Sequence, residues 1–377
     1  MKPKTTIVLA VAVCLCMLLS FGGGTAFASG SGGVSPSKAT SAAKFGGMSK
    51  LISAAKKEKT LNVITLPADW ANYGAIMKDF TKKYGIKIVD ENPDGSSQDE
   101  VNAMKELKGQ SRAPDVLDMG TSFAIEAAQS GLLTPYKVAS WKDIPSSAKA
   151  GNGDWYDDYG GYVAIGYDPS KVKTPPKSFA DLLKPRYKNM VGINGNPTQA
   201  GAAFAAVFAA SLANGGSFNN IQPGIQYFQK LKQAGNFVPV TASAATVQSG
   251  QTPIVIYWDY LQASQIKAEV PNWKIVIPTD GHYASYYSQA VSATAPHPAA
   301  ARLWEEYLYS TTGQNLWLQG YARPIELPTL VAKGSVDKKA YEALPPAPKG
   351  KTTFPSSAQL AKAETVVTQQ WAQVLSS

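Results

Sequence analysis

Strand-like and helix-like segments alternate along the chain from residue 60 onward. Residues Thr60 to Leu66 alternate between apolar and polar side chains, and Trp70 to Tyr84 carries apolar residues at helical spacing. A second strand is predicted over Ile86 to Val89, and a third over Pro114 to Gly120 leads directly into a helix over Phe123 to Gln129. This repeated order predicts an α/β fold with a mixed, mostly parallel sheet, whose ligands bind where strands end and helices begin.

The same order of elements returns after a glycine-bounded strand over residues 160–167. The further predicted segments are a strand over 190–193, an alanine-rich helix over 200–213, and strands over 252–257 and 274–278. Because an apolar strand then returns near residue 286, the pattern predicts two lobes between which the chain crosses twice. The predicted boundaries place residues 58–165 and 288–377 in lobe 1, and residues 166–287 in lobe 2.

The amino terminus has the three-part pattern of a secretory signal. Lys2 and Lys4 precede an uncharged apolar run from Ile7 to Phe21, and Ala26-Phe27-Ala28 follows as a small-x-small cleavage site. The run is shorter than the ~20 residues of a membrane-spanning helix, so we expect cleavage after Ala28 and a periplasmic or extracellular protein, with an uncleaved anchor as the alternative. Residues 29–57 are predicted to form a flexible leader and a first helix.

Composition and charge narrow the possible functions. The chain has 377 residues, 44% of them hydrophobic and 17% charged, which is an ordinary globular composition. Both cysteines, Cys14 and Cys16, lie in the predicted signal, so we expect no disulfide and no thiolate chemistry in the mature protein. Without residues 1–28 the formal charge falls from +9 to +7, and the lysines are scattered rather than interleaved with aromatic residues. Nucleic acid is therefore not a predicted partner.

Short motifs distributed along the chain carry a family resemblance. They are Pro114–Asp118, Gly131–Tyr136, Tyr167–Pro169, Lys177–Leu183 and Ala299–Gln314. In this order, behind a signal peptide and over about residues 58–325, they resemble the extracellular solute-binding proteins of ABC transporters, in the type II group of polyamine, ferric-iron and aminophosphonate binders. The resemblance implies two α/β lobes joined by a two-crossover hinge, a single small polar solute held between them, a membrane permease as partner, a monomer, and no catalysis, cofactor or resident metal.

Few residues suit an enzyme. The two histidines are His282 and His297, and His297 lies between prolines in an expected surface turn, so a Ser-His-Asp arrangement would depend on His282 alone. Paired carboxylates would suit a secreted hydrolase, and the acids Asp154, Asp157 and Asp158 are candidates. Their surroundings are rich in Gly, Asn and Asp, which favours a solvated loop or a weak calcium site. A carboxylate-dependent hydrolase is kept as the minor alternative.

Candidate ligand-binding residues follow the predicted strands. Asp69 and Trp70 come after the first strand, where they either face the cleft or cap and pack the next helix. Ser97, predicted to open a helix through a capping box with Glu100, and Ser122 place hydroxyl and backbone N–H groups at helix starts, which suits an anion. Thr198 repeats the arrangement in the second lobe. Each is also an ordinary helix-capping residue type, but three such turns aimed at one cleft favour binding.

The segment Tyr257-Trp258-Asp259-Tyr260 is the most specific clue to the solute. It follows an apolar strand, where an aromatic face and a carboxylate hold an ammonium by cation–π attraction and a charge-assisted hydrogen bond. We expect Asp259 and Asp69 to hold a cationic amine, either polyamine-like or part of an aminophosphonate. The predicted set is Asp69, Trp70, Ser97, Ser122, Thr198, Tyr257, Trp258, Asp259 and Tyr287, in which Trp258, Trp70 and Tyr287 enclose the amine and the hydroxyls take any anionic end.

Three alternatives to this reading of the site stay open. Ferric binders of the group carry adjacent tyrosines at the similar position, and Tyr257, Tyr260, Tyr286 and Tyr287 could converge on hard Fe(III). Aromatic side chains combined with Asp and Asn also suit the hydroxyl groups of a sugar. Finally, Trp258 and Tyr260 could be core residues that contact no solute.

Overall fold

Strands and helices alternate through most of the described chain, which comprises residues 34–348 and 353–376 of the computed structural model. The strands are β1 (Thr60–Ile64), β2 (Lys87–Glu91), β3 (Val116–Gly120), β4 (Leu133–Thr134), β5 (Tyr156–Tyr167), β6 (Val191–Ile193), β7 (Phe237–Thr241), β8 (Ile254–Trp258), β9 (Lys274–Val276), β10 (Ala284–Ser292) and β11 (Arg323–Pro324). The α-helices are α1 (Ala42–Phe45), α2 (Met48–Glu58), α3 (Tyr73–Tyr84), α4 (Ser97–Glu106), α5 (Thr121–Gln129), α6 (Phe179–Leu182), α7 (Gly201–Ala213), α8 (Gln222–Gln233), α9 (Ala244–Ser249), α10 (Asp259–Leu261), α11 (Lys267–Glu269), α12 (Pro298–Leu308), α13 (Thr311–Gln319), α14 (Leu327–Ala332), α15 (Lys338–Glu342) and α16 (Ser357–Ser376).

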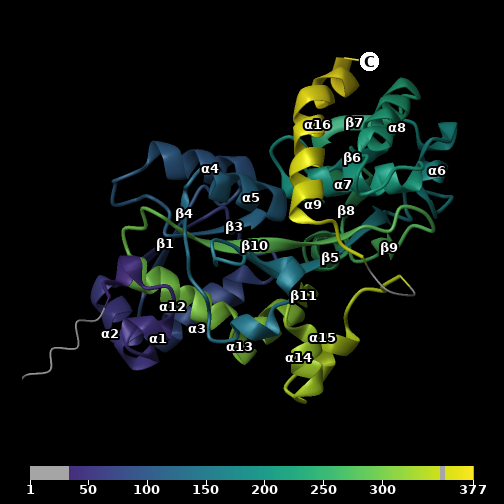
Figure 1. The fold of residues 1–377 in the computed structure, drawn as a ribbon. Helices are drawn as coiled ribbons and strands as arrows, with labels where there is room; N and C mark the ends of the chain where they lie inside the picture. The colour runs from purple at the N-terminus through teal and green to yellow at the C-terminus, as the bar shows by residue number, and fades with distance from the viewer. Residues whose placement is uncertain (1–33, 349–352, 377) are drawn as a thin grey trace, which may run out of the picture. The chain divides into compact units, whose positions relative to one another are not determined.

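The long strand β5 joins the two halves of the main sheet (Figure 1). Its first half pairs with β10 and β11, and its second half pairs with β8 and β9. In the described chain the main sheet has the order β3-β10-β5-β8-β6-β7, while β1 and β2 form a separate parallel pair. We use the name lobe 1 for β1–β4, β10 and β11 together with α2–α5, α12 and α13. We use the name lobe 2 for β6–β9 together with α6–α11. The residues at which each lobe begins and ends stay a prediction.

The main sheet is mixed, as predicted, but it contains less parallel pairing than the alternation of strands and helices suggested. Among the described strands, parallel pairs are confined to β1–β2, β6–β7 and β6–β8. Strands β5 and β10 run antiparallel to every strand they pair with. The reason is that these strands do not return through a crossover helix, which is the connection that makes neighbouring strands parallel.

Most predicted elements are found within a few residues of their expected bounds. One local detail differs, because the cap of α4 is Ser96, whose hydroxyl accepts from the Asp99 backbone N–H while the Asp99 carboxylate accepts from the Ser96 N–H. The predicted box of Ser97 and Glu100 is therefore shifted by one residue toward the amino terminus. This shift leaves both Ser97 and Glu100 buried rather than occupied in capping.

Helix α7 shows why an alanine-rich segment lies in the interior of lobe 2. Its residues from Gly201 to Ser211 are all buried, so the helix has no solvent-facing stripe. Helices that are apolar on every side are buried on every side. Small side chains let α8 approach closely, and an added Cβ at Gly224 on α8 would lie only 2.2 Å from the Val207 carbonyl oxygen.

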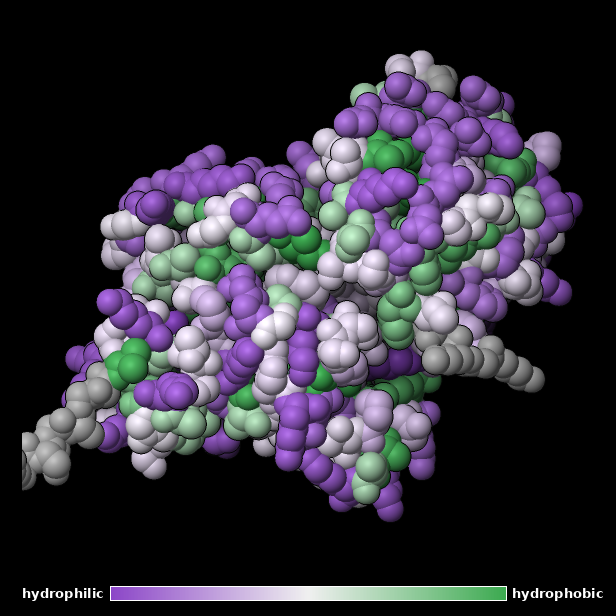
Figure 2. Space-filling view, in the orientation of Figure 1, coloured by the Kyte–Doolittle hydropathy of each residue, from purple (hydrophilic) through white to green (hydrophobic). Residues whose placement is uncertain are grey.

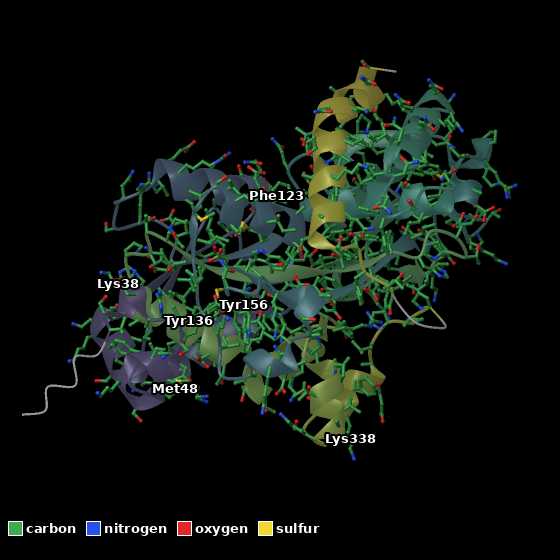
Figure 3. The ribbon with its side chains drawn as sticks, viewed as in Figure 1. Lys38, Met48, Phe123, Tyr136, Tyr156 and Lys338 are labelled. Atoms are coloured by element: carbon green, nitrogen blue, oxygen red, sulfur yellow. The ribbon has the colours of Figure 1, made fainter. Side chains whose placement is uncertain are left out.

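Aromatic residues fill the core of lobe 1 beside α12. Trp304 on α12 packs edge-on against Phe80 of α3, with ring centroids 5.1 Å apart. Tyr136 and Tyr156, labelled in Figure 3, are fully buried, and their hydroxyls donate to the Glu306 and Glu305 carboxylates at 2.8 and 3.0 Å. These hydrogen bonds give the two buried glutamates of α12 a neutral polar partner each.

The carboxyl-terminal helix α16 contacts both lobes. It packs on α5 of lobe 1 and on α8 of lobe 2, and in Figure 1 it lies as the yellow helix between them. Trp371 supplies the apolar contact with lobe 2, against Phe228 and Phe237 at centroid distances of 5.4 and 6.4 Å. Glu364 faces lobe 1, where burial raises the pKa of its carboxyl to about 7 and the Ser122 hydroxyl opposes the shift.

The amino-terminal segment is attached to lobe 1 from residue 34 onward. The predicted signal and its cleavage site, together with residues 29–33, lie outside the described residues. The rest of the predicted leader is not free, because the Arg302 guanidinium donates to the Ala39 and Ser37 carbonyls at 2.7 and 3.0 Å. The prediction of a flexible leader is therefore corrected for residues 34–47, where a buried arginine on α12 fixes the backbone.

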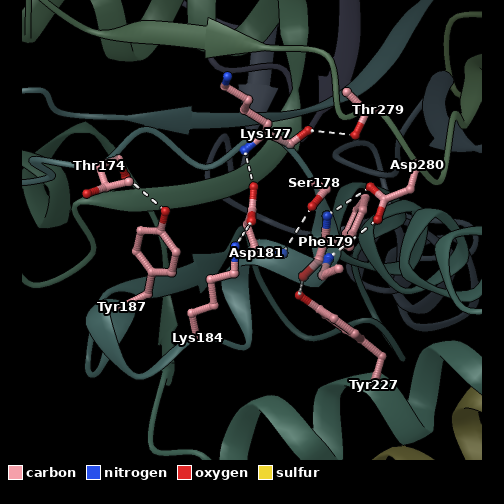
Figure 4. Close-up of polar contacts among 11 residues, drawn as sticks. Thr174, Lys177, Ser178, Phe179, Asp181, Lys184, Tyr187, Tyr227, Thr279 and Asp280 are labelled. Carbon is pink, nitrogen blue, oxygen red and sulfur yellow. Dashed lines mark hydrogen bonds and ion pairs between the residues drawn. The ribbon is translucent and has the colours of Figure 1, made fainter.

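The segment Lys177–Leu183, which carried part of the family resemblance, has a structural role. Ser178 caps α6 by accepting from the Asp181 N–H at 3.0 Å, and the Asp280 carboxylate accepts from the Phe179 N–H at 2.9 Å (Figure 4). The Tyr227 hydroxyl of α8 donates to the Phe179 carbonyl at 2.8 Å. This motif ties a short helix to the loop before β10 and lies away from the cavity described below.

The surface of the described chain is mostly polar. The face drawn in Figure 2 shows hydrophilic and neutral residues with scattered hydrophobic ones. In residues 34–348 and 353–376, no helix has the length and apolar character needed to cross a membrane.

Candidate functional site

A cavity of about 590 Å³ lies between lobe 1 and lobe 2, where several strands end and helices begin. Lobe 1 contributes the segments after β1 and β2, the start of α4, Asp118 in the middle of β3 and Tyr287 of β10. Lobe 2 contributes the turn between β6 and α7, the segment after β7 and the π-helical turn after α10. The lining residues used below are Asp69, Trp70, Asp94, Ser96, Ser97, Asp99, Glu100, Asp118, Asn196, Gln199, Ala200, Gly201, Tyr257, Gln265 and Tyr287.

The charged residues that line the cavity are all acidic. They are Asp69, Asp94, Asp99, Glu100 and Asp118, and no Lys, Arg or His is among the described lining residues. The first three are exposed at the rim, whereas Glu100 and Asp118 are buried. The cavity therefore attracts cations and repels anions, apart from any effect of backbone dipoles.

An aromatic cluster forms one wall of the cavity. Trp70 packs edge-on against Tyr287 at 5.5 Å and against Tyr257 at 6.3 Å between ring centroids. The Trp70 indole N–H donates to the Tyr159 hydroxyl at 2.7 Å, and the Tyr257 hydroxyl donates to the Gln265 side-chain oxygen at 3.2 Å. Since these polar atoms are already paired, the rings present mainly their π faces and edges to a solute, which suits cation–π contacts.

Asp118 lies at the floor of the cavity with one oxygen held in place. Its Oδ2 accepts from the Tyr159 hydroxyl at 2.6 Å, which extends the chain of hydrogen bonds from Trp70 to the carboxylate. Its Oδ1 is buried without a hydrogen-bond donor in good geometry, although the Tyr73 hydroxyl and the Asp158 carboxyl lie near enough to lower its pKa. Burial raises the pKa of Asp118 to about 7, against the opposing effect of the Tyr159 hydroxyl.

Glu100 is buried beside Asp118 and is tied to its backbone. The Glu100 Oε2 atom accepts from the Asp118 N–H at 3.0 Å. Burial, followed by the charge of Asp118, raises the pKa of Glu100 well above its ordinary value. The shift favours the neutral form of Glu100 beside Asp118.

Two helix amino termini face the same cavity from opposite lobes. Ser97 begins α4, and the Gln98 N–H donates across the lobes to the Gln199 carbonyl at 3.2 Å. Helix α7 begins after Ala200, which provides no side-chain cap, so the first N–H groups of α7 have no side-chain acceptor. Backbone N–H groups and the positive end of the helix dipole suit an anionic group.

The two lobes approach each other closely at a pair of glycines. A Cβ on either Gly120 or Gly201 would lie 3.1 Å from the Cα of the other. A larger residue at either position would push the lobes apart. The cavity therefore depends on glycine at the end of β3 and at the start of α7.

Five of the predicted site residues line the cavity, and four do not. Asp69, Trp70, Ser97, Tyr257 and Tyr287 lie in the lining. The Ser97 hydroxyl also accepts from the Gly120 N–H at 3.1 Å, which connects α4 with β3.

The other four predicted residues have positions that local structure accounts for. Thr198 donates to the Asn196 side-chain oxygen at 3.0 Å within its own turn. Ser122 and Trp258 border a separate, nearly filled cavity of about 20 Å³. Trp258 is buried between the rings of Tyr260 and Tyr283, at 6.2 and 6.4 Å, which fits the core alternative.

Asp259 lies outside the cavity and already has a cationic partner. Its Oδ2 accepts from the Arg323 guanidinium at 2.6 Å, and its Oδ1 accepts from the Tyr162 and Tyr260 N–H groups at 2.9 Å each. The carboxylate is fully buried against β5, where Gly161 leaves room for it: a Cβ there would lie 2.2 Å from Oδ1. Burial raises the pKa of Asp259, and Arg323 opposes the shift. The predicted amine contact is replaced by an ion pair inside the protein.

The four tyrosines of the ferric alternative do not share one site. Tyr257 and Tyr287 line the cavity, but Tyr260 is buried behind it and Tyr286 packs against Phe354 at 5.3 Å. Burial raises the pKa of Tyr257 and of Tyr287, which disfavours the tyrosinate that binds Fe(III). In the described ranges no three His, Cys, Asp or Glu side chains form a metal-binding group.

The acids considered for a hydrolase are separated by burial. Asp154 is half-buried, whereas Asp157 and Asp158 are buried on β5, which corrects the expectation of a solvated loop. Asp157 accepts from the Thr121 and Ser288 hydroxyls at 3.1 and 2.7 Å. These contacts connect strands and leave no open pair of carboxylates.

Sequence reasoning missed Asp118 and Glu100 as cavity residues. Both were part of the predicted elements, and Asp118 was quoted in the motif Pro114–Asp118, but neither follows a strand end as the chosen candidates did. A charged residue inside an apolar strand was the available signal, because burying a charge is costly unless it has a partner or a function.

Residues 111–351 match the model of a family described as bacterial extracellular solute-binding protein. The chain belongs to this family. The resemblance drawn from the motifs is thereby confirmed, and the fold is that of type II periplasmic binding proteins. Members bind small solutes outside the cytoplasm and serve ABC transporters, and neither the family nor the similar folds below are enzymes.

Solved structures of similar fold cover most of this solute-binding protein. Iron-bound HitA from Pseudomonas aeruginosa is 22% identical with a TM-score of 0.61. AfuA from Actinobacillus pleuropneumoniae, with fructose-6-phosphate bound, is 18% identical with a TM-score of 0.67. A putative spermidine/putrescine ABC transporter protein from Listeria monocytogenes is 12% identical with a TM-score of 0.62. Each match covers 84% of this chain and 99% of the other.

Proposed function

We propose that this solute-binding protein captures a small cationic amine in the cavity between its lobes and delivers it to a membrane permease of an ABC transporter. The observation that carries the proposal is the all-acidic lining beside an aromatic wall. An ammonium about 4 Å from a carboxylate gains roughly 4 kcal/mol at the effective dielectric constant of a protein surface. A phosphorylated sugar would instead meet acidic side chains without a basic partner.

The solute contacts follow from the lining. Asp69 at the rim and Asp118 at the floor hold positive charge, and Trp70, Tyr257 and Tyr287 enclose it. An amine that also carries an anionic group, such as an aminophosphonate, would direct that group to Ser97 and to the starts of α4 and α7. Asp259, Trp258, Ser122 and Thr198 are not part of the proposed contacts.

The similar folds include proteins whose names refer to iron, fructose-6-phosphate and spermidine or putrescine, so the fold itself is compatible with several solutes. The acidic lining favours the cationic members of this set. A neutral sugar remains the competing candidate because aromatic rings and carboxylates also bind hydroxyl groups.

A thermal-shift panel tests the solute class. The panel contains spermidine, putrescine, 2-aminoethylphosphonate, ferric citrate, fructose-6-phosphate and glucose, each added to purified protein. A ligand at 100 times its Kd stabilises the folded state by about 2.7 kcal/mol, a readily measured shift. Stabilisation by an amine supports the proposal, whereas stabilisation by the sugar or the ferric complex alone contradicts it.

A matched pair of variants then locates the amine. Asp69→Asn removes an acid at the rim and is expected to weaken amine binding about fivefold, as exposed charge pairs contribute up to about 1 kcal/mol. Asp154→Asn removes a half-buried acid outside the lining and serves as the control. Equal affinities of the two variants would place the amine away from Asp69.

We also propose that the monomer closes around one solute by bending β5 and β10. The segments Val163–Tyr167 and Tyr287–Ser292, which contain the predicted lobe boundaries, belong to these two strands. Small-angle X-ray scattering should give a smaller radius of gyration with saturating solute. An identical scattering profile with and without solute would contradict closure.

A further inference from the structure

We propose that Asp118 selects for positive charge by exchanging its own proton for the cationic group of the solute. This inference rests on the proposed amine function and adds to it the chemistry of capture. The carboxylic acid of the empty cavity becomes a carboxylate when the ammonium arrives. The ammonium keeps its protons, and the proton from Asp118 leaves to the solvent.

The geometry leaves Asp118 ready for a cationic partner. Its side chain is 5% exposed, lines the cavity, and has a buried Oδ1 atom without a hydrogen-bond donor in good geometry. The Tyr159 hydroxyl fixes Oδ2, so the carboxyl group cannot rotate away without losing a 2.6 Å hydrogen bond. A buried carboxylate without a compensating partner is costly, and a carboxyl group in that position takes up a proton.

The groups that face Asp118 do not neutralise it. They are acidic, phenolic or amide groups, namely Tyr73 of α3, Glu100 of α4, Asp158 and Tyr159 of β5, Tyr260 of α10, Tyr287 and Gln289 of β10 and, farther away, Glu305 of α12. None of these groups is a Lys, Arg or His.

The position of Asp118 in the lining makes it the exchanging group. Burial raises the pKa of Asp118 to about 7, which favours its protonated form when no cation is near. Burial and the charge of Asp118 raise the pKa of Asp158 well above its ordinary value, and the pKa of Glu100 is raised in the same way. Asp158 does not line the cavity, so within the pair of neighbouring aspartates Asp118 is the one that a solute meets.

The sign of the pH dependence follows from the raised pKa of Asp118. A nearby ammonium favours the ionised carboxylate, so binding releases up to one proton below about pH 7 and none well above it. With a pKa of about 7 in the empty cavity, amine affinity is expected to be about tenfold lower at pH 6 than at pH 8. An amine that binds only at the rim would show no such dependence.

Titration calorimetry in buffers of different ionisation enthalpy measures the exchange directly. The probe is the amine with the largest shift among spermidine, putrescine and 2-aminoethylphosphonate. At pH 6 the wild-type protein is expected to release close to one proton per amine bound, beyond any proton that the free probe itself gains or loses, and at pH 8.5 close to none. This measurement uses only the wild-type chain.

The variant Asp118→Asn keeps the shape of the side chain and an acceptor for Tyr159. It is expected to bind the amine at least tenfold more weakly at pH 8 and to lose both proton release and the pH dependence. The control Asp154→Asn is expected to keep all three properties. If Asp118→Asn does not fold, carbon-13 NMR titration of carboxyl-labelled wild-type protein must show an aspartate that titrates near neutral pH and shifts with the amine.

The outcomes separate the two proposals. Amine binding without proton release at pH 6 overturns the exchange and leaves the amine function intact. Absence of binding by every amine in the panel overturns both. Proton release that persists in Asp118→Asn assigns the exchange to another group and overturns the role of Asp118.

Discussion

The buried ion pair between Arg323 and Asp259 is expected to stabilise the fold rather than to bind solute. The substitution Arg323→Met keeps much of the side-chain volume and removes the guanidinium, whose Nη1 atom lies 2.6 Å from Asp259 Oδ2. It leaves a fully buried carboxylate with two backbone N–H donors, from Tyr162 and Tyr260. The lost contacts of Arg323 also include a hydrogen bond to the Pro345 carbonyl and a position over the Tyr162 ring.

The magnitude follows from what remains around Asp259. Removing one partner of a buried ion pair costs about 3–5 kcal/mol, and the two remaining donors together with protonation of the acid place this case near the lower end, at about 3 kcal/mol. A chain of this size has an unfolding entropy of roughly 0.7 kcal/mol/K, so the midpoint of thermal unfolding should fall by about 4 °C.

The pH dependence of the loss gives a second signature. Burial already raises the pKa of Asp259, and Arg323 opposes that shift, so removing Arg323 raises the pKa further. The folded variant then holds a proton on Asp259 over a pH range in which the unfolded chain does not. Stability of the variant therefore rises as pH falls, and its deficit relative to the wild type should be smaller at about pH 5 than at about pH 7.

Urea and thermal unfolding of ligand-free protein at both pH values measure these effects. Arg112→Met, which removes an exposed arginine, is the matched control and should change little. The double variant Arg323→Met with Asp259→Asn should regain part of the lost stability because no unpaired charge remains. Unchanged unfolding of Arg323→Met at pH 7, or a selective loss of amine affinity in Asp259→Asn, would refute the structural role of the pair.

Other regions give further predictions. Trp371→Ala should lower the free energy of unfolding by about 3 kcal/mol, because α16 loses its main aromatic contact with lobe 2; a change below 1 kcal/mol in urea titrations would contradict this. Gly201→Ala should weaken solute binding without lowering ligand-free stability, because the added Cβ meets Gly120 only when the lobes are closed. Titration calorimetry of Gly201→Ala and of Gly120→Ala, which changes the other side of the same contact, checks this. The hydrogen bond to buried Asp115 raises the pKa of His297. The stabilisation that protonated His297 provides is therefore present below about pH 6.5 and is lost as pH rises through the pKa of the folded state. In urea unfolding, His297→Gln should lower the free energy of unfolding more at about pH 5.5 than at about pH 9.

Local patterns in the sequence were enough for most elements and for the family. Alternation and helical spacing gave the bounds of β1, α3, β3 and α7 within a few residues, because side-chain periodicity depends on the local backbone alone. The positions of strand ends and helix starts also identified Asp69, Trp70, Ser97, Tyr257 and Tyr287 as cavity residues. Parallel or antiparallel pairing was less well predicted, because it depends on the path of the chain between strands.

Only the tertiary structure decided which carboxylates are available to a solute. Asp259 and Asp118 both lie in or next to apolar strands, and nothing within a few residues distinguishes them. Asp259 is paired because Arg323, 64 residues further along, reaches it across β5. The hydroxyl and carboxyl groups near Asp118, from Tyr73, Tyr159 and Asp158, carry no positive charge. Such pairing is set by distant segments that folding brings together, and the charge of a buried group depends on those neighbours rather than on the residues beside it in the chain.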